Sequence, residues 1–122
     1  MHVLMFEPRF VSLVEQGIKR HTIRGPRARP IVAGDRLSLR RWVGIPYRSR
    51  QVSIMEARVT QVQGILIDQR WSEPWIEIAA CLLPHNARDE FAERDGFASA
   101  AELVAWHDAA HGLPFEGVLI QW

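Results

Sequence analysis

The sequence predicts an α+β domain, in which residues 1–122 form a small mixed or antiparallel β-barrel with flanking helices. Most apolar segments are short and alternate with polar residues, as strands do, whereas only three stretches show helical spacing or helix caps. The length suits one hydrophobic core, and 48% hydrophobic with 24% charged residues is ordinary for a globular protein. These observations favour a single domain rich in strands.

The first quarter of the chain predicts a strand, a helix and a second strand. Residues 3–6 are an apolar run of strand length, and a proline two residues later suits the first turn of a helix. Apolar residues then recur at helical spacing up to Gly17, a residue that favours the end of a helix. In the strand expected at 21–24, alternation places Thr22 and Arg24 on the same face, so a hydroxyl and a guanidinium share one space.

Two further strands are expected in the middle of the chain, between basic loops. The first of these strands is expected at residues 37–42. The second is expected at residues 55–60, where apolar and polar side chains alternate. An apolar segment at 65–67 either continues the second strand or forms another one. The loops at 25–30 and 44–50 are rich in arginine and contain prolines, which interrupt regular structure.

The last third predicts two helices and a closing strand. Asn86 is suited to cap a short helix that Gly96 ends, and Ser99 with Glu102 matches a capping box for the next helix. The buried stripe of this second helix is expected to comprise Leu103, Trp106 and Ala110. Residues 117–122 then read as a strand.

The sequence has no pattern typical of a membrane or secreted protein. No apolar run approaches the roughly 20 residues that span a bilayer, so no membrane partner is expected. Residues 1–7 lack the basic and apolar regions of a signal peptide, so a cytoplasmic location is expected. Cys81 is the only cysteine, and its apolar neighbours predict a buried, inert thiol. Trp71, Trp75 and Trp122 are likewise expected in the core.

Charge is distributed unevenly along the chain. Residues 1–50 hold eleven Lys or Arg and three Asp or Glu, a net charge of +8, whereas residues 51–122 hold four and eleven, a net charge of −7. A basic half is what a phosphate-binding surface requires, which favours a nucleic acid or nucleotide partner. Pairing of the two halves with each other is the alternative interpretation.

Lys19 is the only lysine among fifteen Lys and Arg residues. Arginine stays protonated in proteins, whereas a lysine loses its proton more easily beside other cations, here Arg20 and Arg24. Thr22 follows three residues later, and a threonine hydroxyl becomes a nucleophile when such a base is in reach. Asp95 is a carboxylate that could carry a second proton. Lys19, Thr22 and Asp95 are the candidate catalytic set, with a simple strand threonine and an Asp-Gly turn as the alternatives.

Arginines and one tyrosine form a candidate binding surface. Guanidinium groups bind phosphates through paired hydrogen bonds, aromatic faces stack on bases, and loops carry binding residues more often than regular elements do. Trp42 also has suitable chemistry but is expected in the core. The candidate binding residues are Arg20, Arg24, Arg27, Arg29, Arg41, Tyr47, Arg48 and Arg50.

His107 and His111 lie four residues apart on the last predicted helix, which is the spacing of two metal ligands. A zinc site of the metalloprotease type would have glutamate after the first histidine, where this chain has Asp108, and no third ligand is evident. Histidines near the carboxyl end of a helix also interact favourably with the helix dipole. No metal and no cofactor is therefore predicted.

Four segments, in chain order, resemble the motifs of one known family. They are Gly17-Ile18-Lys19-Arg20-His21-Thr22-Ile23-Arg24, Gly34-Asp35-Arg36-Leu37, Asp95-Gly96-Phe97-Ala98-Ser99 and Phe115-Glu116-Gly117-Val118-Leu119-Ile120. The first resembles the Gly-x-Lys-x-x-Thr-Ile/Val-Arg motif of the ASCH family, small relatives of the PUA RNA-binding domain. The others are similar to the family's Gly-Asp strand entry, its carboxylate-Gly-Phe-x-Ser segment and its closing strand, so the resemblance spans nearly the whole chain.

The resemblance implies a PUA-like barrel with a basic cleft that binds RNA or a modified nucleoside. Some ASCH members are amidohydrolases that remove the acetyl group of N4-acetylcytidine with a lysine, a threonine and a glutamate. Lys19 and Thr22 match the first two positions, and Asp95, one methylene shorter, lies where the glutamate is expected. In that activity Thr22 would attack the amide carbonyl with Lys19 as base. Asp95 would protonate the leaving amine, and Arg24 would hold the substrate or its oxyanion.

Two other activities fit the same resemblance. A non-catalytic RNA-binding module would use the loop arginines on phosphates, and a metal-independent ribonuclease would use Lys19 to stabilise the scissile phosphate. The expected partner in each case is RNA, a nucleoside or a nucleotide. No obligate protein partner is predicted.

Overall fold

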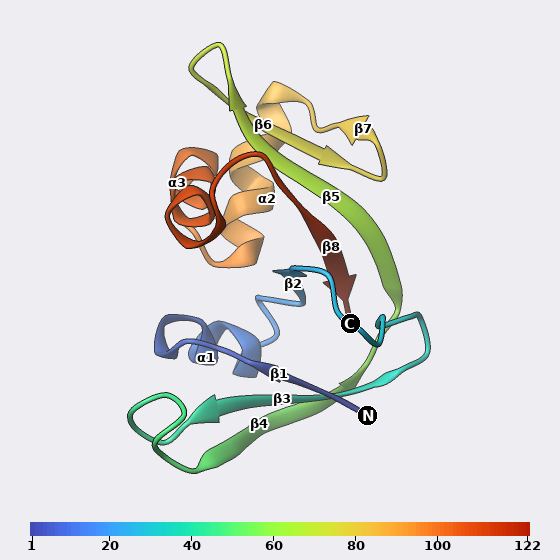
Figure 1. The fold of residues 1–122 in the computed structure, drawn as a ribbon, viewed down its shortest axis with the longest axis vertical. Helices are drawn as coiled ribbons and strands as arrows, with labels where there is room; N and C mark the ends of the chain where they lie inside the picture. Colours follow the sequence, from blue (N-terminus) through green and yellow to red (C-terminus); the bar gives the residue numbers. More distant parts are fainter.

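The structure is a computed structural model that describes residues 1–122, with eight strands and three α-helices (Figure 1). In chain order the elements are β1 (His2–Met5), α1 (Pro8–Glu15), β2 (His21–Arg24), β3 (Arg36–Trp42), β4 (Gln51–Arg58), β5 (Gln61–Arg70), β6 (Glu73–Ile78), β7 (Cys81–Leu82), α2 (Arg88–Asp95), α3 (Ala100–His111) and β8 (Phe115–Gln121). A short 3₁₀ turn over His85–Ala87 leads into α2. None of the helices is long and apolar enough to cross a membrane.

The strands form two sheets, which confirms the predicted α+β class. In the three-stranded sheet, of order β1-β3-β4, β1 is parallel to β3 and β3 is antiparallel to β4. The five-stranded sheet, of order β2-β8-β5-β6-β7, is antiparallel throughout. The closing strand β8 therefore lies between β2 and β5, and the end of the chain lies beside β2 (Figure 1).

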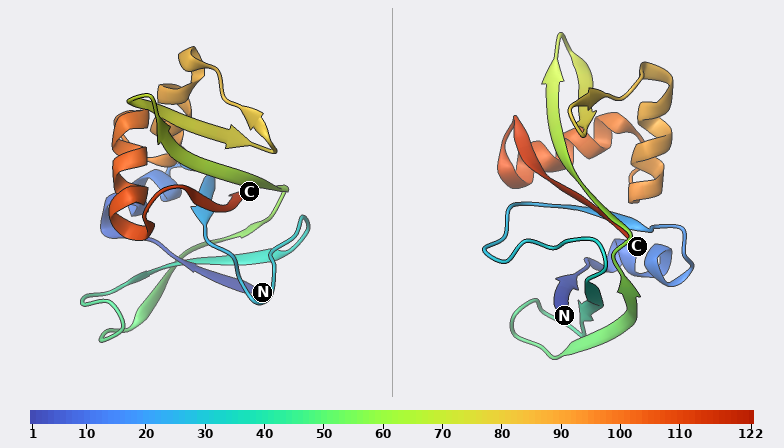
Figure 2. Two further views of the ribbon diagram at one scale, coloured as in Figure 1. Left: turned by 45° about the horizontal axis from the view of Figure 1, so that its top comes forward. Right: turned by 90° about the vertical axis from the view of Figure 1, so that its right-hand side faces the viewer.

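The two sheets do not close into the predicted barrel. They are joined on one side, where β4 continues into β5 as one bent segment through Val59 and Thr60 (Figure 2). Elsewhere β1 and β2 are free edges of their sheets, and no ladder joins them. A side chain crosses this gap in place of a backbone ladder, because Arg24 Nη2 donates a hydrogen bond to Met5 O at 2.7 Å. We call this gap the β1–β2 seam.

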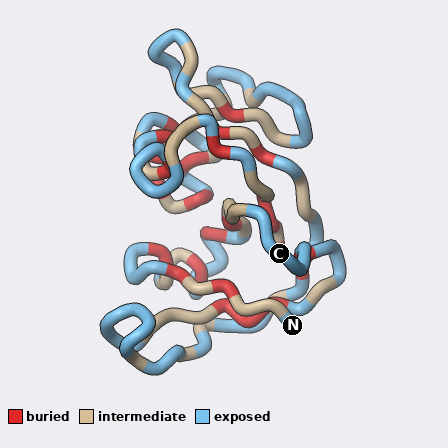
Figure 3. The backbone as a smooth tube through the Cα atoms, viewed as in Figure 1, coloured by how far each residue is buried: buried red, intermediate tan, exposed pale blue.

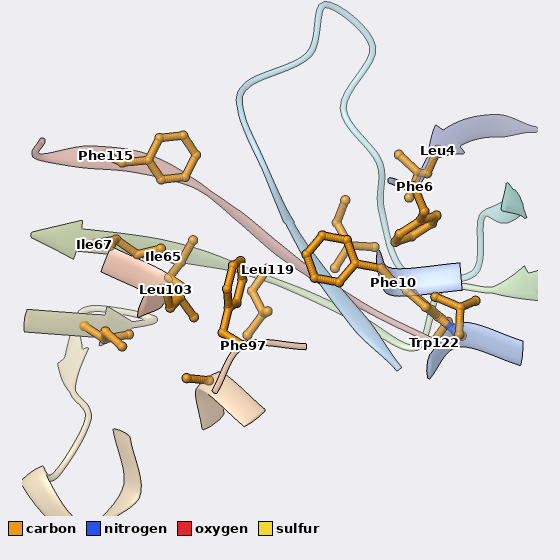
Figure 4. Packing of buried hydrophobic residues seen from close by; sticks show 14 of the residues in the cluster. Leu4, Phe6, Phe10, Ile65, Ile67, Phe97, Leu103, Phe115, Leu119 and Trp122 are labelled. Carbon is orange, nitrogen blue, oxygen red and sulfur yellow. The ribbon is translucent and has the colours of Figure 1, made fainter. Parts of the chain in front are cut away.

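The core is a cluster of 20 buried hydrophobic side chains from both sheets and all three α-helices. Buried segments lie on the inner strands and helices, whereas the hairpin ends are exposed (Figure 3). Phe10 of α1, Leu103 of α3 and Leu119 of β8 are among the packed side chains in Figure 4. Polar groups buried together with this core are Lys19, Thr22, Ser38, Asp95 and His107. Burying a polar group is costly without a partner, so these buried polar residues are candidates for a functional site.

The turn between α2 and α3 packs closely against α1. Gly96 ends α2 with a φ of 100°, and a Cβ at this position would lie only 2.6 Å from Phe10 Cδ1. Arg9 donates hydrogen bonds to Gly96 O at 3.1 Å and to Glu102 Oε1 at 2.7 Å. Ser99 Oγ accepts from the backbone N–H of Glu102, as the capping motif predicts. These contacts fix the end of α2, and with it the carboxylate of its last residue.

The outer hairpins of the five-stranded sheet contradict two expectations about apolar residues. Trp71 is 82% exposed in the β5–β6 turn, and Cys81 is exposed on β7 rather than buried. Both lie at or next to tight turns, where Trp71 and Ala80 have φ values of 51° and 62°. The β5–β6 and β6–β7 turns extend away from α2 and α3 (Figure 1). Trp122, in contrast, is in the core as predicted, at 8% exposure.

The buried face of α3 differs from the predicted stripe. Leu103 is buried as expected, but Trp106 is half-buried and Ala110 is exposed. Val104 and His107, each 2% exposed, turn inward in their place. The reason is that α3 packs against α2, β5, β6 and β8 together, so its apolar face is set by four neighbours rather than by one sheet.

Candidate functional site

A cavity of about 260 Å³ lies at the β1–β2 seam. Its walls come from both edge strands and from all three α-helices, so segments distant in sequence meet there. The volume is close to the lower end of the range for small-molecule sites, about 300–1,000 Å³. We call it the seam cavity. Its lining residues are Met5, Phe6, Glu7, Phe10, Lys19, Thr22, Ile23, Arg24, Gly25, Asp95, Phe97, Trp106, His107 and His111.

Lys19 and Asp95 form a buried ion pair in the wall of the seam cavity. Lys19 Nζ donates to Asp95 Oδ1 at 2.6 Å and to the backbone oxygen of the same residue at 2.7 Å. Each residue is only 3% exposed. The ammonium also lies 5.1 Å from the centroid of the Phe10 ring, within cation–π range. Two of its three N–H groups are thus used within the protein, and the third has no protein acceptor.

The pKa of Lys19 is lowered from its ordinary value, chiefly because burial disfavours the charged ammonium. Asp95 acts in the opposite direction through its charge and its hydrogen bond, while Arg24 and Arg9 lower the pKa further. The direction agrees with the sequence prediction, but the main cause is different. Neighbouring arginines are a secondary contribution, and Arg20 lies exposed on the surface.

Thr22 and Arg24 contact each other directly, as the strand alternation predicts. Thr22 is 4% exposed, and its Oγ1 accepts a hydrogen bond from Arg24 Nε at 3.0 Å. The guanidinium lies 4.9 Å from the Phe6 ring centroid, and burial lowers the pKa of Arg24 to about 10. Because the Thr22 oxygen accepts this bond, its hydroxyl proton is free to be donated elsewhere. No hydrogen bond joins Thr22 to Lys19.

His21 is a neighbour of Asp95 that the sequence did not single out. Its Nε2 lies 3.2 Å from Asp95 Oδ1, without the alignment of a hydrogen bond, and is the one fully enclosed side-chain polar atom that has no partner. The ring stacks on Phe91 of α2 at 5.1 Å between centroids. Strand alternation places His21 on the face opposite Thr22, so the sequence pattern gives no reason to group it with the catalytic set.

His107 is a second residue whose position the sequence did not predict. It is 2% exposed, its Nδ1 lies 2.9 Å from Leu103 O, and burial lowers its pKa. His111, one helical turn later, also lines the seam cavity. Their spacing of four residues fits either metal ligands or histidines placed favourably at the end of a helix dipole, and neither interpretation predicts a place in the cavity wall. No group of three or more His, Cys, Asp or Glu residues is arranged to hold a metal ion.

The candidate binding residues are spread over the molecule. Arg24 lines the seam cavity, and the loop that carries Arg27 begins there, at Gly25. The β3–β4 hairpin projects at one end of the three-stranded sheet (Figure 1). Tyr47 lies in this hairpin, is 89% exposed, and contacts Trp42 with 5.1 Å between ring centroids. The candidate binding residues that do not line the cavity are Arg20, Arg27, Arg29, Arg41, Tyr47, Arg48 and Arg50.

The seam cavity gathers the groups that acyl transfer requires. Thr22 supplies a hydroxyl, Lys19 and Asp95 form a pair that can move protons, and Arg24 supplies a cation for a developing negative charge. Burial strengthens each of these electrostatic interactions. The chain matches no protein-family model, no curated protein and no solved structure at a significant level.

Proposed function

We propose that the seam cavity binds an N-acylated pyrimidine nucleoside, free or within RNA, and hydrolyses its exocyclic amide, with N4-acetylcytidine as the first substrate to test. The observation that carries the proposal is that Lys19, Thr22 and Asp95, all nearly fully buried, line one cavity. The resemblance to ASCH amidohydrolases, and with it a PUA-like relationship, supports the same conclusion. A cavity of about 260 Å³ suits one nucleoside rather than a nucleic acid duplex.

The first step is attack of Thr22 Oγ1 on the amide carbonyl carbon. Asp95 Oδ1, 2.6 Å from Lys19 Nζ, takes one ammonium proton, and the resulting neutral amine accepts the proton of Thr22. The hydrogen bond from Arg24 Nε stabilises negative charge as it develops on Oγ1. The lowered pKa of Lys19 favours the amine form that this step needs.

The second step is release of the amine. The tetrahedral intermediate collapses, the C–N bond breaks, and the proton held by Asp95 passes to the departing nitrogen to give cytidine. Water then attacks the acetyl group on Thr22 and the ester C–O bond breaks; one water proton restores the Thr22 hydroxyl, and acetate departs with the other proton released to solvent. Aspartate is shorter than the glutamate of similar amidohydrolases, but its contact with Lys19 at 2.6 Å supports the same role without the extra methylene.

Acetate and cytidine release from N4-acetylcytidine by the purified protein tests the proposal. Thr22→Val removes the nucleophile while it keeps the side-chain shape, and we expect turnover to fall by at least about 100-fold. Thr60→Val is the matched control, because Thr60 is the other threonine of the chain and is exposed. An acetyl adduct on Thr22, detected by mass spectrometry, would support the covalent step. Absence of acetate release by the wild-type protein would contradict the proposal.

Binding without turnover is a second candidate function. It is supported by the hydrogen bonds of the resting site, in which Lys19 is held by two oxygens of Asp95 and Thr22 by Arg24. In this case the protein binds the nucleoside or RNA but releases no acetate. A phosphate-dominated RNA interface gives a steep log–log dependence of affinity on salt concentration, so a slope near zero would exclude it. RNA that stays intact while tightly bound contradicts a ribonuclease.

A further inference from the structure

His107 presents a buried hydrogen-bond acceptor that nothing in the protein uses. The ring is tightly packed, with centroid distances of 4.9 Å to Trp106 and 5.1 Å to Phe115. Its Nδ1 lies 2.9 Å from the carbonyl oxygen of Leu103, one turn earlier in α3. A carbonyl oxygen can only accept, so Nδ1 carries the hydrogen and Nε2 carries a lone pair.

The Nε2 atom of His107 opens to the seam cavity. It makes no hydrogen bond within the protein. It is also not fully enclosed, because the only fully enclosed side-chain polar atom without a partner is Nε2 of His21. His107 Nε2 is therefore reached from the cavity that its ring lines. Water can satisfy this acceptor while the cavity is empty of ligand, but a ligand that fills the cavity displaces that water, so a ligand that donates a hydrogen bond to Nε2 binds better than one that leaves it unpaired.

The charged and titratable groups around His107 keep this acceptor available. Burial is the main influence and favours the neutral ring, and His111 and Lys19 act in the same direction. Asp95 and the bond to Leu103 oppose them, without reversing the net lowering of the pKa. At neutral pH the ring therefore offers a lone pair rather than a second N–H to the cavity.

The other polar groups of the cavity complement this acceptor. Lys19 has one N–H without a protein acceptor, and the Arg24 guanidinium also lines the cavity, so both can donate to a ligand. A secondary amide has one acceptor, its carbonyl oxygen, and one donor, its N–H. The cavity thus offers donors for the first and an acceptor for the second.

We propose that His107 Nε2 accepts a hydrogen bond from the amide N–H of the ligand and makes the cavity selective for secondary over tertiary amides. This inference rests on the proposed function, because it names the group that recognises the same acylated nucleoside. His107 is then a specificity-determining residue. It holds the leaving nitrogen by its N–H while the lone pair of that nitrogen receives the proton from Asp95.

Two nucleosides and two variants test the inference. We expect kcat/KM of the wild-type protein for N4-acetylcytidine to exceed that for N4-acetyl-N4-methylcytidine by at least about 10-fold. His107→Asn keeps a donor for Leu103 O, but its acceptor, Oδ1, lies on a shorter side chain and does not reach the Nε2 position, so the substitution should raise KM for N4-acetylcytidine about 10-fold or more and abolish the preference for the secondary amide. His107→Gln can place an acceptor near the Nε2 position, so it should recover part of the affinity for N4-acetylcytidine and part of the preference for the secondary amide. His85→Asn, outside the cavity and 81% exposed in its side chain, is the control.

A direct spectroscopic measurement covers the case in which these variants do not fold. In the Thr22→Val background, which does not consume the ligand, the ¹⁵N resonance of His107 Nε2 should shift when N4-acetylcytidine binds and stay in place with the N-methylated nucleoside. Equal binding of the two nucleosides overturns the inference, and so does a His107 ¹⁵N resonance that stays unchanged when N4-acetylcytidine binds. In either case, acetate release by the wild-type protein would still support the proposed function. If neither nucleoside binds, the proposed function fails and the inference fails with it.

Discussion

Two cavities of nearly equal volume contrast in how their polar groups are used. The seam cavity measures about 260 Å³, and a second cavity of about 270 Å³ lies between the β5–β6 hairpin and the segment that leads into α2. We call the second one the tryptophan cavity, because Trp71 and Trp75 line it. In the seam cavity Lys19 and Asp95 are each 3% exposed, whereas the apolar wall of the tryptophan cavity includes Trp71 at 82% exposure.

The polar groups of the tryptophan cavity are satisfied by their neighbours. Arg70 Nε donates to Asp68 Oδ2 at 3.0 Å, and its guanidinium lies 4.6 Å from the Trp75 ring centroid. Trp75 Nε1 donates to Glu77 Oε2 at 2.6 Å, and Arg88 donates to Pro74 O. In the seam cavity, by contrast, a buried ammonium and a buried imidazole each keep unused hydrogen-bonding capacity. The two cavities therefore hardly differ in volume. They differ in their polar groups, because those of the seam cavity are buried and keep unused hydrogen-bonding capacity.

The largest expected difference concerns the cost of breaking an ion pair. Lys19→Met leaves the Asp95 carboxylate buried without its partner, so we expect the free energy of unfolding to fall by about 3–5 kcal/mol. Arg94→Met is the matched control, because Arg94 and Glu90 lie at the same distance of 2.6 Å but have side chains 68% and 64% exposed. That substitution should cost less than about 1 kcal/mol. Urea denaturation measures both, and equal losses would remove the contrast between buried and exposed pairs.

An intermediate effect is expected for the pH dependence of stability. Burial lowers the pKa of His107 in the folded protein, so just below the ordinary histidine pKa of about 6.5 the unfolded chain binds a proton that the folded protein does not. Protonation of the unfolded state then lowers the free energy of unfolding as the pH falls through this range.

Urea denaturation at about pH 7 and about pH 5 measures this contribution. The wild-type protein should lose more stability over this interval than His107→Asn, which lacks the titrating group. Asp95, Lys19 and His111 act on the charge of His107 and are present in both proteins. Identical pH profiles would show that His107 titrates in the folded state as it does in the unfolded chain.

The smallest effect is expected at the tryptophan cavity. Trp71→Ala removes a side chain that is 82% exposed, and surface substitutions of this kind change the free energy of unfolding within about 0.5 kcal/mol. Turnover of N4-acetylcytidine should be unchanged, since the residue lies outside the seam cavity. A strong loss of turnover in Trp71→Ala would mean that the tryptophan cavity also contributes to nucleoside binding.

The local pattern of the sequence predicted the parts of the site that depend on near neighbours. Strand alternation placed Thr22 beside Arg24, and their hydrogen bond of 3.0 Å follows from two residues on one face of β2. The capping motif likewise predicted that Ser99 would accept from Glu102 N–H at the start of α3. In each case the interacting residues are two or three positions apart, where the geometry of one element fixes their distance.

The sequence alone therefore determined the α+β class, the nearest-neighbour contacts of the motif and the choice of Lys19 as an unusual residue. Tertiary structure decided the rest. Lys19 meets Asp95 across 76 residues of sequence, and His107 faces the seam cavity because four elements pack against α3. The open β1–β2 seam, rather than a closed barrel, was also decided at this level. A periodic pattern fixes which side chains share a face, but only the packing of whole elements fixes what that face meets.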